Sequence, residues 1–214
     1  MNTIAGAYET LLLAFGPQGW WPSNDTFETA VGAVLTQGTA WTNAAAAIEN
    51  LRRAGALTPE GVAATSEARL ERLVRPAGFY RRKSATVRRL ALLGGSSRDG
   101  WSKLLSLDGE VLRSALLATS GIGPETADAI VLYAARHPTF VIDAYTRRFV
   151  LRHSLASRGA GYDELKSLFE SSLPRSAELY GEYHALLVEL GKRYCRKRPR
   201  CEDCPLAGAL RPAT

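Results

Sequence analysis

Asp143 is the residue whose type and position are best suited to chemistry. It follows the apolar run 140–142 and precedes the basic segment 144–148, at the position where a helix N-cap is expected. Backbone N–H groups at a helix start favour the ionised form of a carboxylate, so we expect Asp143 to be charged at neutral pH. A fixed negative charge can stabilise a developing cation and orient a water molecule, although the residue could equally serve as a cap alone.

A glycine-rich turn lies upstream of this acid. Gly121, Ile122 and Gly123 separate two predicted helices, 110–119 and 125–137. Glycines allow a sharp turn and close backbone approach to a ligand, and the N–H groups at the start of the next helix can bind an anion. The turn therefore suits contact with one nucleic-acid phosphate without reading sequence, although a tight helical hairpin needs the same glycines.

Composition favours a nucleic-acid partner. The chain has 214 residues, with 27 Lys+Arg against 21 Asp+Glu and a formal net charge of +6; most of the basic residues are arginines, whose planar guanidinium suits phosphate oxygens. The length suits one large domain or two small ones. No apolar run approaches the ~20 residues of a membrane span and no signal peptide begins the chain, so we expect a cytoplasmic protein with no membrane partner.

Three cysteines, Cys195, Cys201 and Cys204, lie within ten residues of one another. An odd and tightly spaced set does not resemble a disulfide framework. The spacing indicates ligands of a metal or cluster in a reducing compartment.

Helical spacing of apolar residues dominates the chain. The only strand-like run, 139–142, is too short and solitary for a sheet. We therefore predict an all-α protein, with helices over 26–35, 42–53, 65–74, 83–93, 110–119, 125–137, 144–153, 162–171 and 176–194.

The glycine turn and an aspartate eighteen residues after Glu125 together resemble the helix-hairpin-helix (HhH-GPD) DNA glycosylase superfamily. Further motifs at 20–22, 27–37, 75–80 and 121–130 are similar to endonuclease III, and more so to 3-methyladenine DNA glycosylase III. The resemblance spans about Trp20 to Cys204. It implies two helical lobes with a DNA-binding cleft. The first is a six-helix barrel lobe over 22–136 that ends with the hairpin, and the second combines 1–21 with 137–214.

The resemblance also implies a reaction. Bifunctional members carry a lysine at the position of Glu125, and a carboxylate cannot form the imine that strand cleavage requires. We therefore expect a monofunctional DNA glycosylase that excises alkylated purines such as 3-methyladenine, with Asp143 stabilising the oxocarbenium-like sugar. A glycosylase for oxidised pyrimidines, a non-catalytic structure-specific DNA-binding protein and residual lyase activity from Lys192 or another amine stay open.

The remaining site residues come from the same resemblance. The base pocket is expected to contain Trp20, Trp21, Pro22 and Trp41, because electron-rich indole faces attract a cationic base. Gln37 is expected to fill the gap left by the extruded nucleotide. Further DNA contacts are expected from Gly121, Ile122, Gly123, Glu125, Thr126, Arg147 and Arg148, with Arg81 and Arg82 as additional basic positions, and the backbone carbonyls of Leu117, Thr119 and Ile122 match a K⁺ or Na⁺ site.

Endonuclease III carries four cysteines around a [4Fe–4S] cluster. Here the first spacing is one residue shorter, and Leu210 stands where the fourth cysteine is expected. A retained cluster, a zinc ion and no metal all stay open, with His184 as a candidate fourth donor to either the cluster or the zinc ion. The resemblance implies a monomer in the cytoplasm, associated with the nucleoid, whose partner is double-stranded DNA containing a damaged base.

Overall fold

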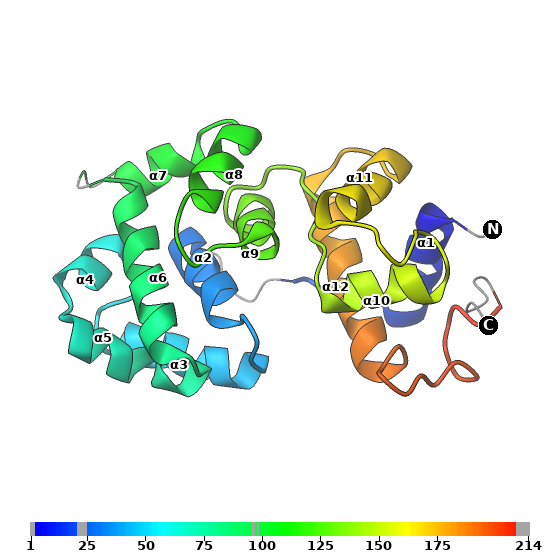
Figure 1. The fold of residues 1–214 in the computed structure, drawn as a ribbon, viewed down its shortest axis with the longest axis horizontal. Helices are drawn as coiled ribbons and strands as arrows, with labels where there is room; N and C mark the ends of the chain where they lie inside the picture. Colours follow the sequence, from blue (N-terminus) through cyan, green and yellow to red (C-terminus); the bar gives the residue numbers. More distant parts are fainter. Residues whose placement is uncertain (1–2, 21–24, 96, 98, 209–214) are drawn as a thin grey trace. The chain divides into compact units, whose positions relative to one another are not determined.

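The computed structural model describes residues 3–20, 25–95, 97 and 99–208. The chain divides into two compact units: a terminal unit, Met1–Pro22 with Pro138–Thr214, and a middle unit, Ser23–His137. The described residues form twelve α-helices, two short helical turns and no strand, which confirms the all-α prediction (Figure 1). Among the same residues, no helix has the length and apolar character needed to cross a membrane.

The middle unit is built around α2 (Thr26–Leu35). Its residues 29–35 are all buried, and it packs against α3, α6, α9 and η2. Asp25 begins this helix, because its Oδ1 accepts a hydrogen bond of 2.7 Å from the backbone N–H of Glu28. The other elements of the unit are α3 (Trp41–Arg53), α4 (Pro59–Ala64), α5 (Glu67–Val74), η1 (Arg75–Ala77), α6 (Tyr80–Leu93), α7 (Gly100–Leu105), α8 (Gly109–Leu117), α9 (Pro124–Ala129) and η2 (Ile130–Ala134).

The main differences from the predicted helices of the middle unit are two short helices that the prediction omitted and one helix that ends differently; α6 also begins at Tyr80, three residues earlier than predicted. The prediction omitted α4, a short helix that begins where Thr58 accepts from the N–H of Gly61 and Pro59 stands at the first turn. It also omitted α7, which has only six residues. The helix predicted to reach residue 137 continues after α9 as the wider turn η2, and Arg136 with φ of +59° then ends it.

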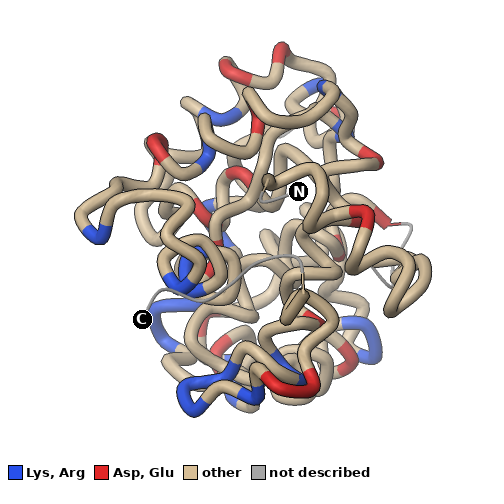
Figure 2. Tube along the Cα trace, turned by 90° about the vertical axis from the view of Figure 1, so that its right-hand side faces the viewer, with Lys and Arg blue, Asp and Glu red and all other residues tan. Residues whose placement is uncertain are grey.

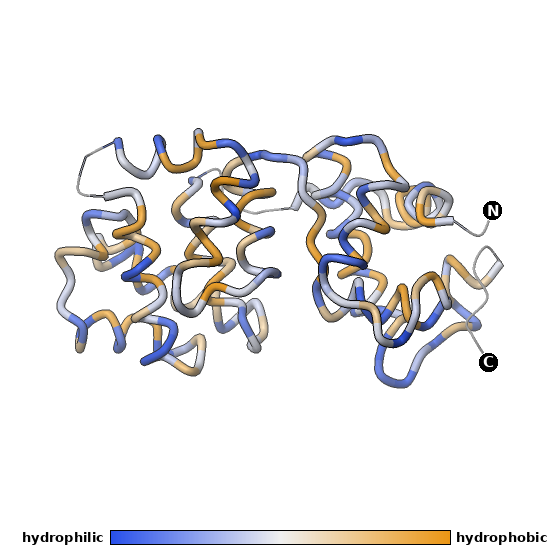
Figure 3. Tube along the Cα trace, turned by 45° about the horizontal axis from the view of Figure 1, so that its top comes forward, coloured by the Kyte–Doolittle hydropathy of each residue, from blue (hydrophilic) through white to orange (hydrophobic). Residues whose placement is uncertain are grey.

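The terminal unit contains α1 (Ile4–Phe15), α10 (Ala144–Arg152), α11 (Tyr162–Ser172) and α12 (Ala177–Arg193). Helix α12 packs against α1 and α10, and hydrophobic positions recur along the helices (Figure 3). An aromatic cluster fills the core: Phe140 stacks on Phe169 with 4.1 Å between ring centroids, and Tyr180 and Tyr183 meet the Phe140 ring edge-on. The buried segment 139–142 therefore anchors the chain directly before Asp143.

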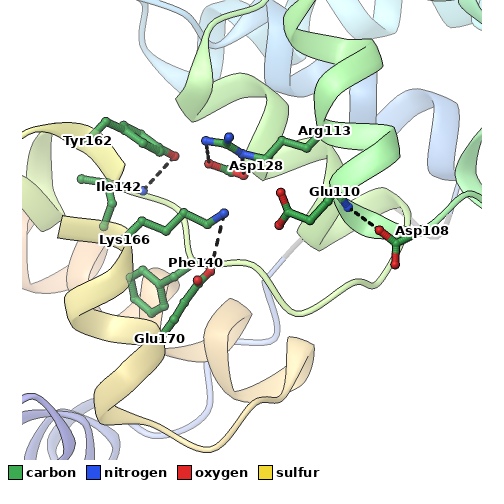
Figure 4. A network of polar contacts seen from close by, with 9 residues as sticks. All are labelled: Asp108, Glu110, Arg113, Asp128, Phe140, Ile142, Tyr162, Lys166 and Glu170. Atoms are coloured by element: carbon green, nitrogen blue, oxygen red, sulfur yellow. Dashed lines mark hydrogen bonds and ion pairs between the residues drawn. The ribbon is translucent and has the colours of Figure 1, made fainter. Parts of the chain in front are cut away.

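A buried ion pair holds together the two helices on either side of the glycine turn. Arg113 of α8 donates from Nε and Nη2 to the two carboxylate oxygens of Asp128 in α9, at 2.7 and 3.2 Å (Figure 4). In the terminal unit, the same figure shows Lys166 and the backbone N–H of Phe140 directed at Glu170; the N–H lies 2.8 Å from Oε1. The first contact holds the helices on either side of the glycine turn, and the second holds the segment that precedes Asp143.

Candidate active site

Asp143 is the N-cap of α10, as predicted. Its backbone is extended, and its Oδ1 accepts a hydrogen bond of 2.7 Å from the N–H of Thr146. The side chain is 13% exposed, so the carboxylate is shielded but remains accessible. This bond uses one carboxylate oxygen for the helix start and leaves Oδ2 to face other groups.

His184 of α12 is the group that faces this second oxygen. Its Nε2 lies 3.8 Å from Asp143 Oδ2, and the preceding residue, Tyr183, is fixed in the core by a 2.8 Å hydrogen bond from its hydroxyl to the carbonyl of Ile4. Burial lowers the pKa of His184, with the Asp143 charge acting in the opposite direction. The sequence interpretation named His184 as a metal donor, whereas the structure places it beside the acid because α10 packs on α12.

This burial predicts an acid-side loss of stability that depends on His184. The unfolded chain takes up a proton near pH 6.5, the ordinary pKa of histidine, whereas the folded chain resists it until a lower pH. The free energy of unfolding should therefore be fully present above pH 6.5 and fall as the pH drops below it. Urea unfolding between pH 7.5 and 5 should show a smaller loss in His184→Gln than in the wild type.

His137 provides the matched control for that experiment, because it is a histidine of the other unit, where its Nε2 lies 2.9 Å from the Leu107 carbonyl oxygen. The His137→Gln variant should keep the His184-dependent part of the pH profile. Identical profiles for the wild type and His184→Gln would contradict the assigned role of His184 burial.

Trp20 contacts the His184 ring. The two rings meet edge-on with centroids 6.4 Å apart, and the ammonium of Lys192 stands over the Trp20 ring at 5.2 Å. Within the terminal unit, a cation therefore already occupies one side of this indole. Two of the other predicted pocket residues, Trp21 and Pro22, lie outside the described residues.

In the middle unit, Gln37 and the glycine turn lie together. The Gln37 amide donates to the carbonyl of Gly121 at 3.1 Å and to the hydroxyl of Thr126 at 2.9 Å. Gly121 has a φ of +95°, and a Cβ there would lie 2.0 Å from the Thr86 hydroxyl, so only glycine fits. Gly123 has open space at the same position, which leaves the backbone before α9 accessible.

The structure reveals an exposed aromatic residue, Phe79, that sequence reasoning did not single out. It is 66% exposed, its φ of +44° is in the left-handed region, and the Arg82 guanidinium lies over its ring at 5.3 Å. A large apolar side chain held outward on a strained backbone is unusual unless it meets a partner. An apolar residue between a glycine and a run of basic residues was the available sequence signal.

Lys83 connects the Phe79 turn to the end of α2. Its buried ammonium donates to the carbonyl of Leu35 at 2.9 Å and to that of Ala77 at 2.7 Å, and burial lowers its pKa. Leu35 precedes Gln37 by two residues. Through its two hydrogen bonds, Lys83 therefore connects the backbone next to Phe79 with the backbone next to Gln37 within the middle unit.

The remaining predicted DNA contacts differ in exposure. Glu125 and the first residue of α3, Trp41, are exposed, the latter at 41%, whereas Ile122 and Thr126 are buried. The Thr119 carbonyl, one of those expected to hold a monovalent ion with the carbonyls of Leu117 and Ile122, accepts a hydrogen bond of 3.0 Å from the N–H of Ile122.

The side chains of Arg147 and Arg148 in α10 make contacts inside the terminal unit. Arg147 donates to the Ala160 carbonyl at 2.6 Å, and the Arg148 guanidinium lies 5.2 Å from the Tyr145 ring centre. Both are half-buried. These contacts restrict the two side chains and leave only part of each available to a partner.

The three cysteines line one cavity of the terminal unit, together with Arg152 and His153. Arg152 donates from Nη1 to the sulfur of Cys195 at 3.2 Å, and burial raises the pKa of the Cys204 thiol. Leu210, where a fourth cysteine was expected, lies outside the described residues. In the described part of the chain, no three donor side chains converge on the position of a single ion.

Comparison with known proteins agrees with this arrangement. Residues 31–175 match the model of the HhH-GPD superfamily of base excision DNA repair proteins. The chain belongs to this superfamily. Over 201 residues it is 40% identical to a protein of Methanocaldococcus jannaschii that is named as a DNA repair glycosylase, covering 93% of this chain and 91% of that one.

Solved structures extend the likeness to the fold of HhH-GPD glycosylases. The Helicobacter pylori 3-methyladenine DNA glycosylase bound to 1,N6-ethenoadenine is 30% identical, with a TM-score of 0.73 over 89% of this chain and 96% of that one. Endonuclease III on DNA, in a non-covalent complex and in a trapped covalent intermediate, is 20% identical with a TM-score of 0.81, covering 97% of this chain and 94% of that one. In this HhH-GPD protein, α8, the glycine turn and α9 are the helix-hairpin-helix element.

Proposed function

We propose that this base excision repair glycosylase is monofunctional and removes alkylated purines such as 3-methyladenine from double-stranded DNA. The position of the Asp143 carboxylate is the observation that supports this proposal most strongly. Its carboxylate caps α10 with Oδ1, presents Oδ2 beside the buried His184, and is only 13% exposed. A fixed and shielded negative charge of this kind suits a reaction that develops positive charge on a sugar.

The reaction proceeds by departure of the base from the anomeric carbon of the extruded nucleotide. As the glycosidic bond lengthens, the sugar becomes oxocarbenium-like, and the Asp143 carboxylate stabilises that charge electrostatically. The same carboxylate orients the water that adds to the anomeric carbon. Because the Thr146 N–H holds Oδ1, the carboxylate is already in position before the nucleotide arrives, which removes a reorganisation cost from the reaction.

A cationic purine is the substrate class that best suits the aromatic residues. N3- and N7-alkylated purines carry a positive charge, which an indole face attracts by ~0.5–2 kcal/mol and which also makes the base a good leaving group. Trp41 offers an exposed face, whereas Lys192 occupies one side of Trp20. The 30% identical H. pylori enzyme binds a modified adenine, which supports the same class for this chain.

Both units carry surfaces suited to DNA. In the middle unit, Gln37, the hairpin backbone and exposed Phe79 are positioned for backbone contact and for replacing the stacking lost by an extruded base. In the terminal unit, the segment 196–200 after α12 is almost entirely basic, and Figure 2 marks such residues along the trace. Phosphate contacts of this kind make binding weaken steeply with salt. We expect the protein to act as a monomer.

Release of bases from damaged DNA tests the proposed substrate. Purified protein should release 3-methyladenine from methylated duplex DNA and should leave a duplex with a single oxidised pyrimidine intact. Excision of the oxidised pyrimidine without the alkylated purine would favour the endonuclease III-like alternative. Salt-sensitive binding of both duplexes without excision of either would instead identify a non-catalytic DNA-binding protein.

The same reactions test the absence of lyase activity. Glu125 is exposed at the position where bifunctional relatives carry a lysine, and a carboxylate forms no imine. The product should therefore be an intact strand with an abasic site, cleaved only after alkali, and borohydride should trap no protein–DNA adduct. Endonuclease III serves as the positive control, because its covalent intermediate has been trapped. Strand cleavage without alkali would overturn the claim and direct attention to Lys192.

A further inference from the structure

The cavity lined by the three cysteines contains one histidine. Its walls include Cys195, Cys201, Cys204 and His153, with apolar residues such as Leu190 and Leu206 completing the lining. The His153 Nδ1 atom is fully buried, and its ring contacts Phe149 at 5.2 Å between centroids. The His153 imidazole and three cysteine side chains therefore line the same cavity within the terminal unit.

The chain itself supplies only three thiolates. It has three cysteines in all, so a four-ligand site built from this chain needs a donor of another type. Of the three histidines, His137 belongs to the middle unit and His184 faces Asp143, which leaves His153 as the imidazole at the cavity. Neutral imidazole is an established iron ligand in iron–sulfur proteins, where it replaces cysteine.

A cluster and a single zinc ion place different demands on these four donors. Tetrahedral zinc with Zn–S bonds of about 2.3 Å requires its sulfur ligands to lie about 4 Å from one another. Among the described residues no group of three such donors that could hold a metal ion is found, although all three cysteines line the cavity. In a four-iron cluster each ligand binds a different iron, so the four donor atoms lie farther apart than around a single ion. Three thiolates and one imidazole are donors of the types that such a cluster accepts.

We propose that His153 is the fourth ligand of a four-iron cluster held by Cys195, Cys201 and Cys204. Arg152 supports this assignment, because its guanidinium donates to the Cys195 sulfur at 3.2 Å and to the Arg196 carbonyl at 2.9 Å. A positive charge and an N–H···S hydrogen bond both favour a ligating thiolate. Arg152 is the last residue of α10 and directly precedes His153, so its hydrogen bond to Cys195 connects the first cysteine with the end of that helix.

Helix α10 connects this site to the catalytic carboxylate. Asp143 is its N-cap and His153 its C-cap, and the His153 N–H donates to the Phe149 carbonyl at 3.2 Å. A ligand bond at His153 would hold the carboxyl end of the helix whose amino end positions Asp143. His153 would then be a positioning residue for catalysis as well as a ligand.

Metal analysis of the purified full-length protein tests the proposal. Iron and acid-labile sulfide should each be present at about four per chain, with the broad visible absorption of a brown iron–sulfur protein and little zinc. The His153→Ala variant should lose iron, giving a three-iron signal in electron paramagnetic resonance or the apoprotein. The His153→Cys variant should retain four irons and show a lower midpoint potential, because a thiolate replaces a neutral ligand.

His137→Ala is the matched control and should keep the iron content and potential of the wild type. Circular dichroism of each variant separates loss of ligand from loss of folding, and the His153→Cys result does not depend on the alanine variant folding. The proposal is wrong if wild-type protein contains zinc or no metal. It is equally wrong if His153→Ala keeps four irons with an unchanged potential.

Discussion

Replacing Asp143 by asparagine is expected to slow base excision by about 10²–10⁴-fold while changing DNA affinity by less than about tenfold. Asparagine retains the size of the side chain and an oxygen that can accept the Thr146 N–H, so the cap of α10 survives. The negative charge is lost, and with it the stabilisation of the oxocarbenium-like sugar. Single-turnover excision from methylated duplex DNA and equilibrium binding to the same duplex measure the two quantities separately.

Asp108 provides a matched control for this substitution. It is also a helix N-cap, at the start of α8, where its Oδ1 accepts from the N–H of Glu110 at 2.9 Å. The Asp108→Asn variant should excise at nearly the wild-type rate, because it removes a charge at a cap outside the proposed chemistry. Unchanged excision by Asp143→Asn would reject the catalytic assignment, and an equal loss of binding and excision would make Asp143 a binding residue.

Replacing Arg113 by methionine is expected to lower the free energy of unfolding by about 3–5 kcal/mol. The partner carboxylate, Asp128, is 0% exposed, so the variant leaves a buried charge without the guanidinium that holds both of its oxygens. Because the pair joins α8 to α9, the hairpin between them should also lose order. Urea unfolding followed by circular dichroism gives the stability.

The Lys103–Asp99 pair provides the control for that prediction. Both side chains are largely exposed, although their atoms are only 2.7 Å apart. Water and salt screen such a pair, so Lys103→Met should leave the free energy of unfolding nearly unchanged. A loss of similar size in Arg113→Met and Lys103→Met would show that burial of Asp128 does not determine the cost.

Local patterns in the sequence predicted much of this fold. The apolar spacing of 26–35 matches α2, and the acid before the basic segment at 144–148 proved to be the N-cap of α10. Both features depend on interactions between residues at most four positions apart, which propensity and capping describe well. The short helices α4 and α7 escaped prediction, because six residues provide too few apolar positions to define a period.

The sequence by itself determined the helical class, the glycine that the hairpin requires, and the acid that caps α10. Only the tertiary structure decided which side chains meet across helices: His184 beside Asp143, Lys192 over Trp20, and His153 at the cysteine cavity. The physical reason is packing. These residues come from distant parts of the chain, and they meet because α12 buries its apolar faces against α10 and α1, which no local spacing specifies.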